Sequence, residues 1–306
     1  MTISEINRFK GCLLGLACGD AVGTTVEFYP RGRFKPLDDM VGGGKFQLKK
    51  GEWTDDTSMA LCLAESLLQK NGCDAHDQME RYWKWGNEGY LSCKPHAFGV
   101  GKTVARALGV FHRTDNPYAG STDPATAGNG SIMRLAPVVM YYYPNVDDVI
   151  QFAAQSSLTT HGAEECILSC QLLASILYNA LAGKDKETVL LQNYLTNVSL
   201  PQSIQKIADG NYRDKSIEQI RGTGYVVESL EAALWCFYTT ENFKDAILQA
   251  ANLGDDADTT AAICGQVAGA YYGVGAIPSS WLNELAMKEH ISDAAENLYN
   301  ENNVKL

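Results

Sequence analysis

The sequence predicts an all-α protein that folds as a single compact domain over residues 1–306. Apolar residues recur with helical periodicity along most of the chain. Alternating strand-like segments are nearly absent, and so is the strand–helix rhythm of a doubly wound sheet. The chain has 306 residues, 45% of them hydrophobic, which is enough for one large core, and no flexible Gly/Ser linker divides it.

The helical periodicity gives eleven expected helices. Their approximate ranges are 4–22, 56–70, 77–88, 101–113, 146–156, 162–182, 187–199, 225–239, 243–252, 259–273 and 280–300. Turn-rich connections are expected at 29–53, 115–130 and 209–224. Long loops of this kind in a compact domain often carry functional residues.

Charge and cysteine usage exclude several classes of function. The net charge of −11 disfavours nucleic acids and anionic membranes as partners, since both require a basic face, so a nucleic acid is expected only as a modified substrate. There is no apolar run of about 18 residues that could span a membrane. The nine cysteines are an odd number in mostly apolar surroundings, which suits reduced thiols and predicts a cytoplasmic protein. Nothing in the sequence requires more than a monomer.

Glycines follow a helical stripe in two of the expected helices. One stripe takes every fourth residue from Gly11 to Gly23, and the other takes every fourth residue from Gly265 to Gly273. A glycine inside a helix costs about 1 kcal/mol relative to alanine, so each stripe needs a compensating close approach between backbones. If the two stripes face each other antiparallel, Asp20 and Glu27 would lie near the start of the late helix.

Two acidic clusters precede helices, at Trp53-Thr54-Asp55-Asp56-Thr57 and at 254–260, which reads GDDADTT. Each cluster alone is equally consistent with ordinary N-capping. Together, five carboxylates would repel one another if the two helix starts converge, and one or two divalent cations would remove that conflict. Carboxylate and hydroxyl oxygens are hard ligands, so the clusters favour Mg²⁺ or Mn²⁺ over zinc.

Two weaker features could contact an anionic ligand. The segment 128–134, GNGSIMR, offers successive backbone amides before an apolar stretch, although Gly-Asn-Gly is equally typical of a tight turn. His161 follows Leu158-Thr159-Thr160, and a single histidine at a helix start is more often structural than catalytic.

In this order, the motifs closely resemble those of the ADP-ribosylglycohydrolase family, which includes dinitrogenase reductase-activating glycohydrolase and the jellyfish J1 crystallins. The matching segments span nearly the whole chain: 11–28, 51–67, 128–138, 156–162, 224–237 and 252–273. The resemblance implies an all-α, orthogonal multi-helix domain with a central cleft that holds two Mg²⁺ or Mn²⁺ ions. It implies the metal ligands Thr54, Asp55, Asp56, Asp256, Asp258 and Thr259, and it leaves Asp255 outside the first coordination shell.

The resemblance also implies a reaction, the hydrolysis of the glycosidic bond between ADP-ribose and a protein side chain or another acceptor. The metal ions would orient the ribose and activate the attacking water, and Glu27 or Asp56 would act in the proton transfer. The residues implied for ADP-ribose binding are Gly128, Asn129, Gly130 and Ser131 for the pyrophosphate, His161, and Tyr225 for stacking on adenine.

The acceptor and two other functions stay open at this stage. Many arginine-directed relatives carry an acidic residue ahead of the loop that here reads Phe98-Gly99-Val100-Gly101. This chain has no carboxylate between Pro95 and Phe111, which argues against arginine and leaves serine-linked, nucleic-acid-linked and small-molecule conjugates. A catalytically silent ADP-ribose-binding or crystallin-like relative is the main alternative, and a helical metal-dependent phosphohydrolase is the other.

Overall fold

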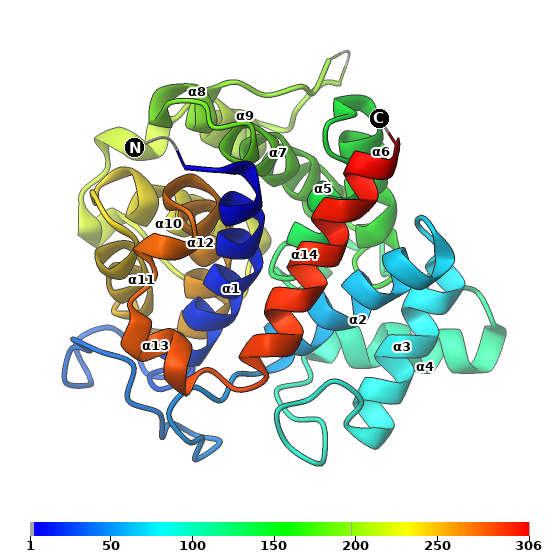
Figure 1. Ribbon diagram of the computed structural model, residues 1–306, viewed down its shortest axis with the longest axis horizontal. Helices are drawn as coiled ribbons and strands as arrows, with labels where there is room; N and C mark the ends of the chain where they lie inside the picture. The colour runs from blue at the N-terminus through cyan, green and yellow to red at the C-terminus, as the bar shows by residue number, and fades with distance from the viewer. Residues whose placement is uncertain (1–2, 197, 306) are drawn as a thin grey trace.

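The computed structural model describes residues 3–196 and 198–305, and within these ranges the chain forms helices and no strand. The other helices are arranged around a central pair, α1 and α12 (Figure 1). Four 3₁₀ turns lie in the connections. The α-helices are α1 (Glu5–Gly23), α2 (Asp55–Lys70), α3 (Ala75–Glu88), α4 (Lys102–Thr114), α5 (Ala136–Tyr142), α6 (Val146–Leu158), α7 (Glu164–Leu181), α8 (Lys186–Leu191), α9 (Gln202–Ala208), α10 (Val226–Tyr238), α11 (Phe243–Ala251), α12 (Ala257–Tyr272), α13 (Ser279–Glu284) and α14 (Lys288–Lys305).

The expected helix at 187–199 is wrong in its length. α8 ends at Leu191, because the Asn179 side chain of α7 donates to the carbonyl of Gln192 at 2.7 Å and draws the chain out of the helix. The chain then runs without regular structure until α9 begins, and residue 197 lies outside the described part. The expected ranges omit α5 and α9, which are seven residues long and show little periodicity.

The expected helix at 280–300 is two helices, α13 and α14. The break lies at Ala286, whose amide donates to the Gly51 carbonyl at 2.9 Å and whose carbonyl accepts from the Trp53 indole at 2.9 Å. Residues of the 29–53 connection therefore form the hydrogen bonds with the Ala286 backbone that a continuous helix would have formed internally.

The two glycine stripes face each other antiparallel, as the spacing predicts. A Cβ atom on Gly15 would lie 2.3 Å from the Gly265 carbonyl oxygen, and one on Gly19 would lie 2.1 Å from the Ala261 carbonyl oxygen. Gly273 is an exception, since it ends α12 with a φ of +75°. The close contact brings the end of α1 to the start of α12, where the second acidic cluster lies.

We expect Gly15→Ala to destabilise the protein by roughly 3 kcal/mol, because backbone rather than a flexible side chain occupies the space of the new methyl group. Urea denaturation would measure the change. Gly275→Ala is the matched control, since a Cβ atom on Gly275 would meet nothing within 4 Å beyond its own chain neighbours, and its loss of stability should be small. Equal stabilities for the two variants would contradict the tight α1–α12 contact.

A second buried cluster forms where α3 and α4 pack beside α2. Its members are Met59, Cys62, Met79, Tyr82, Trp85, Val104, Ala107, Leu108, Phe111 and Met133. α14 runs beside α1 and packs against α2 and α5, so it covers the main core on that side (Figure 1). Asp55 at the start of α2 and Val104 of α4 thereby line the same cleft as Asp258 of α12.

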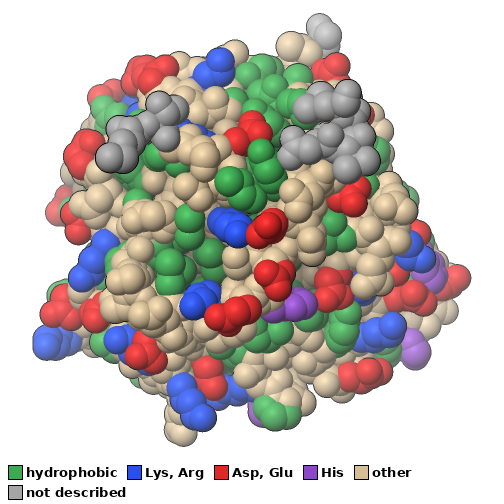
Figure 2. Space-filling model, in the orientation of Figure 1, with side chains coloured by type: hydrophobic (Ala, Val, Ile, Leu, Met, Phe, Trp, Pro, Cys, Tyr) green, Lys and Arg blue, Asp and Glu red, His purple; other side chains and the backbone are tan. Residues whose placement is uncertain are grey.

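The surface and the thiols agree with the composition. Acidic and basic side chains are interspersed over the face shown in Figure 2, so the negative charge is not concentrated there. All nine cysteines carry free thiols, and seven of them are buried. Among the described helices, none combines the length and the apolar character needed to cross a membrane.

Candidate active site

Asp20 of α1 caps the N-terminus of α2 from another helix. Its Oδ1 accepts from the amide and the hydroxyl of Thr54 at 2.9 and 2.8 Å, and its Oδ2 accepts from the amide and the hydroxyl of Thr57 at 3.0 and 2.6 Å. Each carboxylate oxygen of Asp20 thus accepts two hydrogen bonds from the first turn of α2. The capping interpretation of the first acidic cluster is therefore wrong for Asp55 and Asp56, since neither side chain is needed as the cap.

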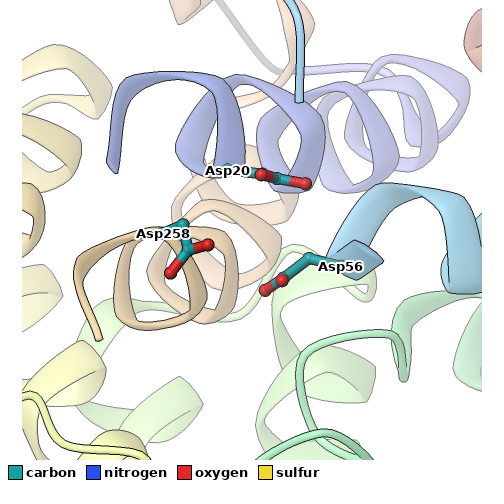
Figure 3. A group of neighbouring side chains, drawn as sticks. All are labelled: Asp20, Asp56 and Asp258. Atoms are coloured by element: carbon teal, nitrogen blue, oxygen red, sulfur yellow. The ribbon is translucent and has the colours of Figure 1, made fainter. Parts of the chain in front are cut away.

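The two predicted acidic clusters converge. Asp20, Asp56 and Asp258 come from three different helices and direct their carboxylates toward one another (Figure 3). In this group, and in the group of Glu27, Asp256 and Asp258, one carboxylate oxygen from each residue lies within 4.8 Å of the others. Asp258 belongs to both groups and therefore joins them.

The Thr54 hydroxyl lies between the carboxylates of Asp20, Asp56 and Asp258. Its Oγ1 donates to Asp20 and lies 3.4 Å from an oxygen of Asp56 and 3.4 Å from an oxygen of Asp258. The Thr259 amide donates to Asp258 Oδ1 at 2.8 Å, which orients that carboxylate at the start of α12.

Burial of so many carboxylates raises their pKa values above the ordinary range. Burial is the main cause for each of Asp20, Glu27, Asp55, Asp56, Asp256 and Asp258, and repulsion from neighbouring carboxylates adds to it for most of them. The pKa of Glu27 rises to about 11, because burial and the charge of Asp258 both penalise its ionised form. Asp56 Oδ1 and Glu27 Oε2 are buried and accept no hydrogen bond from any residue that the structure describes. Such a site either takes up protons or binds cations.

Asn129 positions one of these carboxylates. Its Nδ2 donates to Asp256 Oδ2 at 2.6 Å and to Ser229 Oγ at 3.1 Å. The loop that carries it is held by the bond from the Asn129 amide to the Gly224 carbonyl at 3.1 Å. The side chain of Asn129 is thus committed to the acidic cluster.

We expect Asn129→Ala to weaken divalent-cation binding by roughly 10- to 100-fold, because partners that orient a ligand carboxylate typically have effects of this size. Titration calorimetry with Mn²⁺ would measure the loss. Ser229→Ala is the control, because it leaves the bond between Asn129 and Asp256 in place, and a similar loss in both variants would contradict the orienting role.

A cleft of about 700 Å³ lies over the acidic clusters, within the size range of small-molecule sites. Most of the predicted site residues line it: Glu27, Asp55, Asp256, Asp258, Thr259, Gly128, Asn129, Gly130 and His161. Thr54 and Asp56 are buried beneath these residues. The cleft therefore joins the acidic floor to the Gly-rich loop on one continuous surface.

His161 lines the cleft beside this loop and is held as a neutral hydrogen-bond donor. The guanidinium of the buried Arg134 donates to Thr160 Oγ1 at 2.7 Å, and the Thr160 hydroxyl lies 2.8 Å from His161 Nδ1. Because arginine can only donate, the hydroxyl hydrogen is free for Nδ1, which leaves the ring proton on Nε2. Burial, together with the charge of Arg134, lowers the pKa of His161 to about 3.

Three residues considered in the sequence lie away from the cleft surface. Ser131 is buried and is not among the lining residues. The Tyr225 side chain is partly exposed beside the cleft, and its hydroxyl donates to Glu165 at 2.6 Å. Asp255 is half-buried with a φ of +55°, and its backbone pairs with the segment after Glu27.

Sequence patterns did not indicate the capping role of Asp20 or the wall formed by Phe28, Lys45 and Phe46. A buried aspartate on the face of the glycine stripe is a signal that could have identified Asp20. The 29–53 connection carries no such signal, since its aromatic and basic residues are spaced without periodicity.

The chain is similar to known proteins over nearly its whole length. Residues 1–305 match the model of the ADP-ribosylglycohydrolase family. The chain is 45% identical to "ADP-ribosylarginine hydrolase Tri1" of Pseudomonas putida (strain GB-1), covering 96% of this chain and 78% of that protein. It is 32% identical to "ADP-ribosyl-[dinitrogen reductase] glycohydrolase" of Rhodospirillum rubrum, covering 92% of this chain and 91% of that protein.

A solved structure, "ADP-ribosylglycohydrolase-related protein complex", superimposes with a TM-score of 0.87 at 42% identity, covering 97% of this chain and 98% of that one. The helical fold, the convergent acidic clusters and the match over nearly the whole sequence lead to one assignment. This chain belongs to the ADP-ribosylglycohydrolase family, whose enzymes hydrolyse the glycosidic bonds of ADP-ribose conjugates.

Proposed function

We propose that this protein hydrolyses the N-glycosidic bond between ADP-ribose and an arginine side chain of a modified protein, using two Mg²⁺ or Mn²⁺ ions. The observation that carries the proposal is the convergence of two groups of carboxylates, nearly all of them buried, on the floor of a ligand-sized cleft. Two relatives, at 45% and 43% identity, are named ADP-ribosylarginine hydrolases, and they favour arginine as the acceptor.

The residues present fit a pair of hard cations. The unpaired oxygens Asp56 Oδ1 and Glu27 Oε2 belong to the two different acidic groups, and Asp258 is common to both. Asp20 is excluded as a ligand, since its two oxygens already accept four hydrogen bonds. The proposed ligands are Thr54, Asp55, Asp56, Asp256, Asp258 and Thr259.

Each remaining residue of the site has a role that follows from its position. Bound divalent cations would supply a Lewis acid and an activated water. Glu27 lines the cleft while Asp56 lies beneath it, so Glu27 Oε2 is the better placed group to take or return the proton. Asn129 keeps Asp256 oriented toward the floor.

The Gly-rich loop and His161 would hold the pyrophosphate. The Nε2–H of His161 and the amide of Gly130 lie on one wall of the cleft, whereas the amides of Gly128 and Asn129 already donate to Thr126 and Gly224. Ser131 does not line the cleft and is left out of this role, and Tyr225, which does not line it either, is not proposed to stack on adenine.

We further propose that the chain acts as one domain and as a monomer. The free, mostly buried thiols favour a cytoplasmic enzyme.

A substrate panel tests the proposal. Conjugates of ADP-ribose with arginine, serine and a nucleic-acid end would be incubated with Mg²⁺, with Mn²⁺ and with EDTA. We expect release of free ADP-ribose from the arginine conjugate, only with a cation present. AMP or phosphate as the product would indicate a phosphohydrolase, and binding of ADP-ribose without any product would indicate the catalytically silent alternative.

A further inference from the structure

Phe28 has an unfavourable backbone conformation at the mouth of the cleft. Its φ is +69°, in the left-handed region that bulky side chains rarely adopt. The backbone is held there by the bond from the Phe28 amide to the Asp255 carbonyl at 2.7 Å and by the bond from the Asp255 amide to the Tyr29 carbonyl at 2.9 Å. The residue is also 53% exposed, so burial of the side chain contributes little to offset the strain. Strained and exposed residues of this kind tend to occur at ligand contacts.

The face of the Phe28 ring already accepts a cation. Lys45 Nζ lies 4.2 Å from the ring centroid, and no carboxylate of a described residue lies within 4 Å of that ammonium. Phe46 meets Phe28 edge to face with ring centroids 6.2 Å apart, and Phe98 lies 5.3 Å beyond Phe46. We call Phe28, Lys45, Phe46 and Phe98 the aromatic rim.

The 98–104 segment joins the aromatic rim to the Gly-rich loop, and its residues from Gly99 to Val104 line the cleft. Gly99 follows Phe98, and a Cβ atom on it would lie 2.5 Å from Asp55 Oδ1 on the floor. Five residues later, Val104 lies beside Gly130. A pyrophosphate on the loop therefore directs the ribose over the acidic floor and the acceptor toward the rim.

The mouth of the cleft offers a cationic acceptor no carboxylate of its own. Among the described residues that line the cleft, the only carboxylates are Glu27, Asp55, Asp256 and Asp258, which all belong to the floor. Guanidinium groups stack on aromatic faces as well as pairing with anions. An aromatic face at the rim can therefore replace the acidic residue that the 95–111 segment lacks.

We propose that the Phe28 ring is the subsite for the guanidinium of the modified arginine, and that Lys45 occupies this face until the substrate displaces it. The inference rests on the proposed function and adds the basis of acceptor recognition. Two cations do not share one ring face, so substrate binding includes release of the Lys45 ammonium into solvent.

Steady-state kinetics on ADP-ribosyl-arginine test the subsite. Phe28→Leu should lower kcat/KM by about tenfold, and Phe28→Tyr, which keeps the ring, should restore most of that loss. Phe28→Asn should show the same loss while matching or exceeding the wild-type melting temperature, because asparagine tolerates the positive φ. Lys45→Met should lower KM, since it removes the competing cation. Tyr29→Leu is the control, because Tyr29 is an exposed aromatic neighbour outside the cleft, and it should keep the wild-type kcat/KM.

Inhibition by free ADP-ribose distinguishes a role of Phe28 in binding the acceptor from a role in binding the nucleotide. The inhibition constant should be the same in wild type and in Phe28→Leu, since ADP-ribose has no guanidinium. An equal loss in kcat/KM and in ADP-ribose affinity would assign the ring to the nucleotide and overturn the subsite. Unchanged kinetics in Phe28→Leu would overturn it as well. An inactive wild type would instead overturn the proposed function, and the subsite with it.

Discussion

Replacing Asp258 with asparagine is expected to lower kcat/KM by at least about 10³-fold, equivalent to about 4 kcal/mol of transition-state stabilisation. Asp258 is the residue common to both acidic groups, so its loss removes a ligand charge from each. Divalent-cation affinity should fall by more than roughly 100-fold in the same variant. Helix content should stay unchanged, because the asparagine carbonyl can still accept from the Thr259 amide.

Asp255→Asn is the matched control for this experiment. Asp255 is three residues away but lies outside both acidic groups and outside the cleft lining, and asparagine suits its φ of +55°. Activity assays, calorimetry with Mn²⁺ and circular dichroism on both variants would distinguish the two positions. Wild-type turnover by Asp258→Asn, with turnover also unaffected by EDTA, would refute a metal-dependent reaction at this site.

Removal of divalent cations is expected to abolish turnover and to make the fold less stable as pH rises. The carboxylates of the floor have folded-state pKa values above their unfolded values, so the native protein binds more protons than the unfolded chain. Stability then falls with pH from the unfolded value near 4 upward, and for Glu27 the loss continues to a pKa of about 11. Each extra proton contributes a slope of about 1.4 kcal/mol per pH unit.

Cations reverse this dependence, because they replace the protons and bind more tightly as the carboxylates ionise. Thermal unfolding between pH 5 and 8 would be compared in EDTA and in Mn²⁺. Asp55→Asn removes one of the buried carboxylates and should flatten the slope seen in EDTA, which separates the site from the general effect of a rising negative charge. Identical slopes with and without cation would contradict the dimetal site.

Much of the fold could be predicted because helices depend on local spacing. The periodicity of apolar residues and the four-residue glycine stripes are properties of short segments, and α1 and α12 lie where these patterns predict. Where the prediction is wrong, distant residues decide. The Gln192 carbonyl, just after α8, accepts a hydrogen bond from Asn179. Between α13 and α14, the backbone of Ala286 forms hydrogen bonds with Gly51 and Trp53.

The same division holds for the site. The residue types available at the site can be read from the sequence: two Asp/Thr clusters at helix starts, a Gly-rich loop and a histidine, in the order typical of one family. Their individual roles depend on tertiary contacts. The tertiary structure commits Asp20 to capping α2, turns the Tyr225 hydroxyl toward Glu165, and holds Phe28 strained and exposed at the mouth of the cleft. These roles depend on hydrogen bonds and packing between segments tens to hundreds of residues apart, and local sequence patterns carry no record of such contacts.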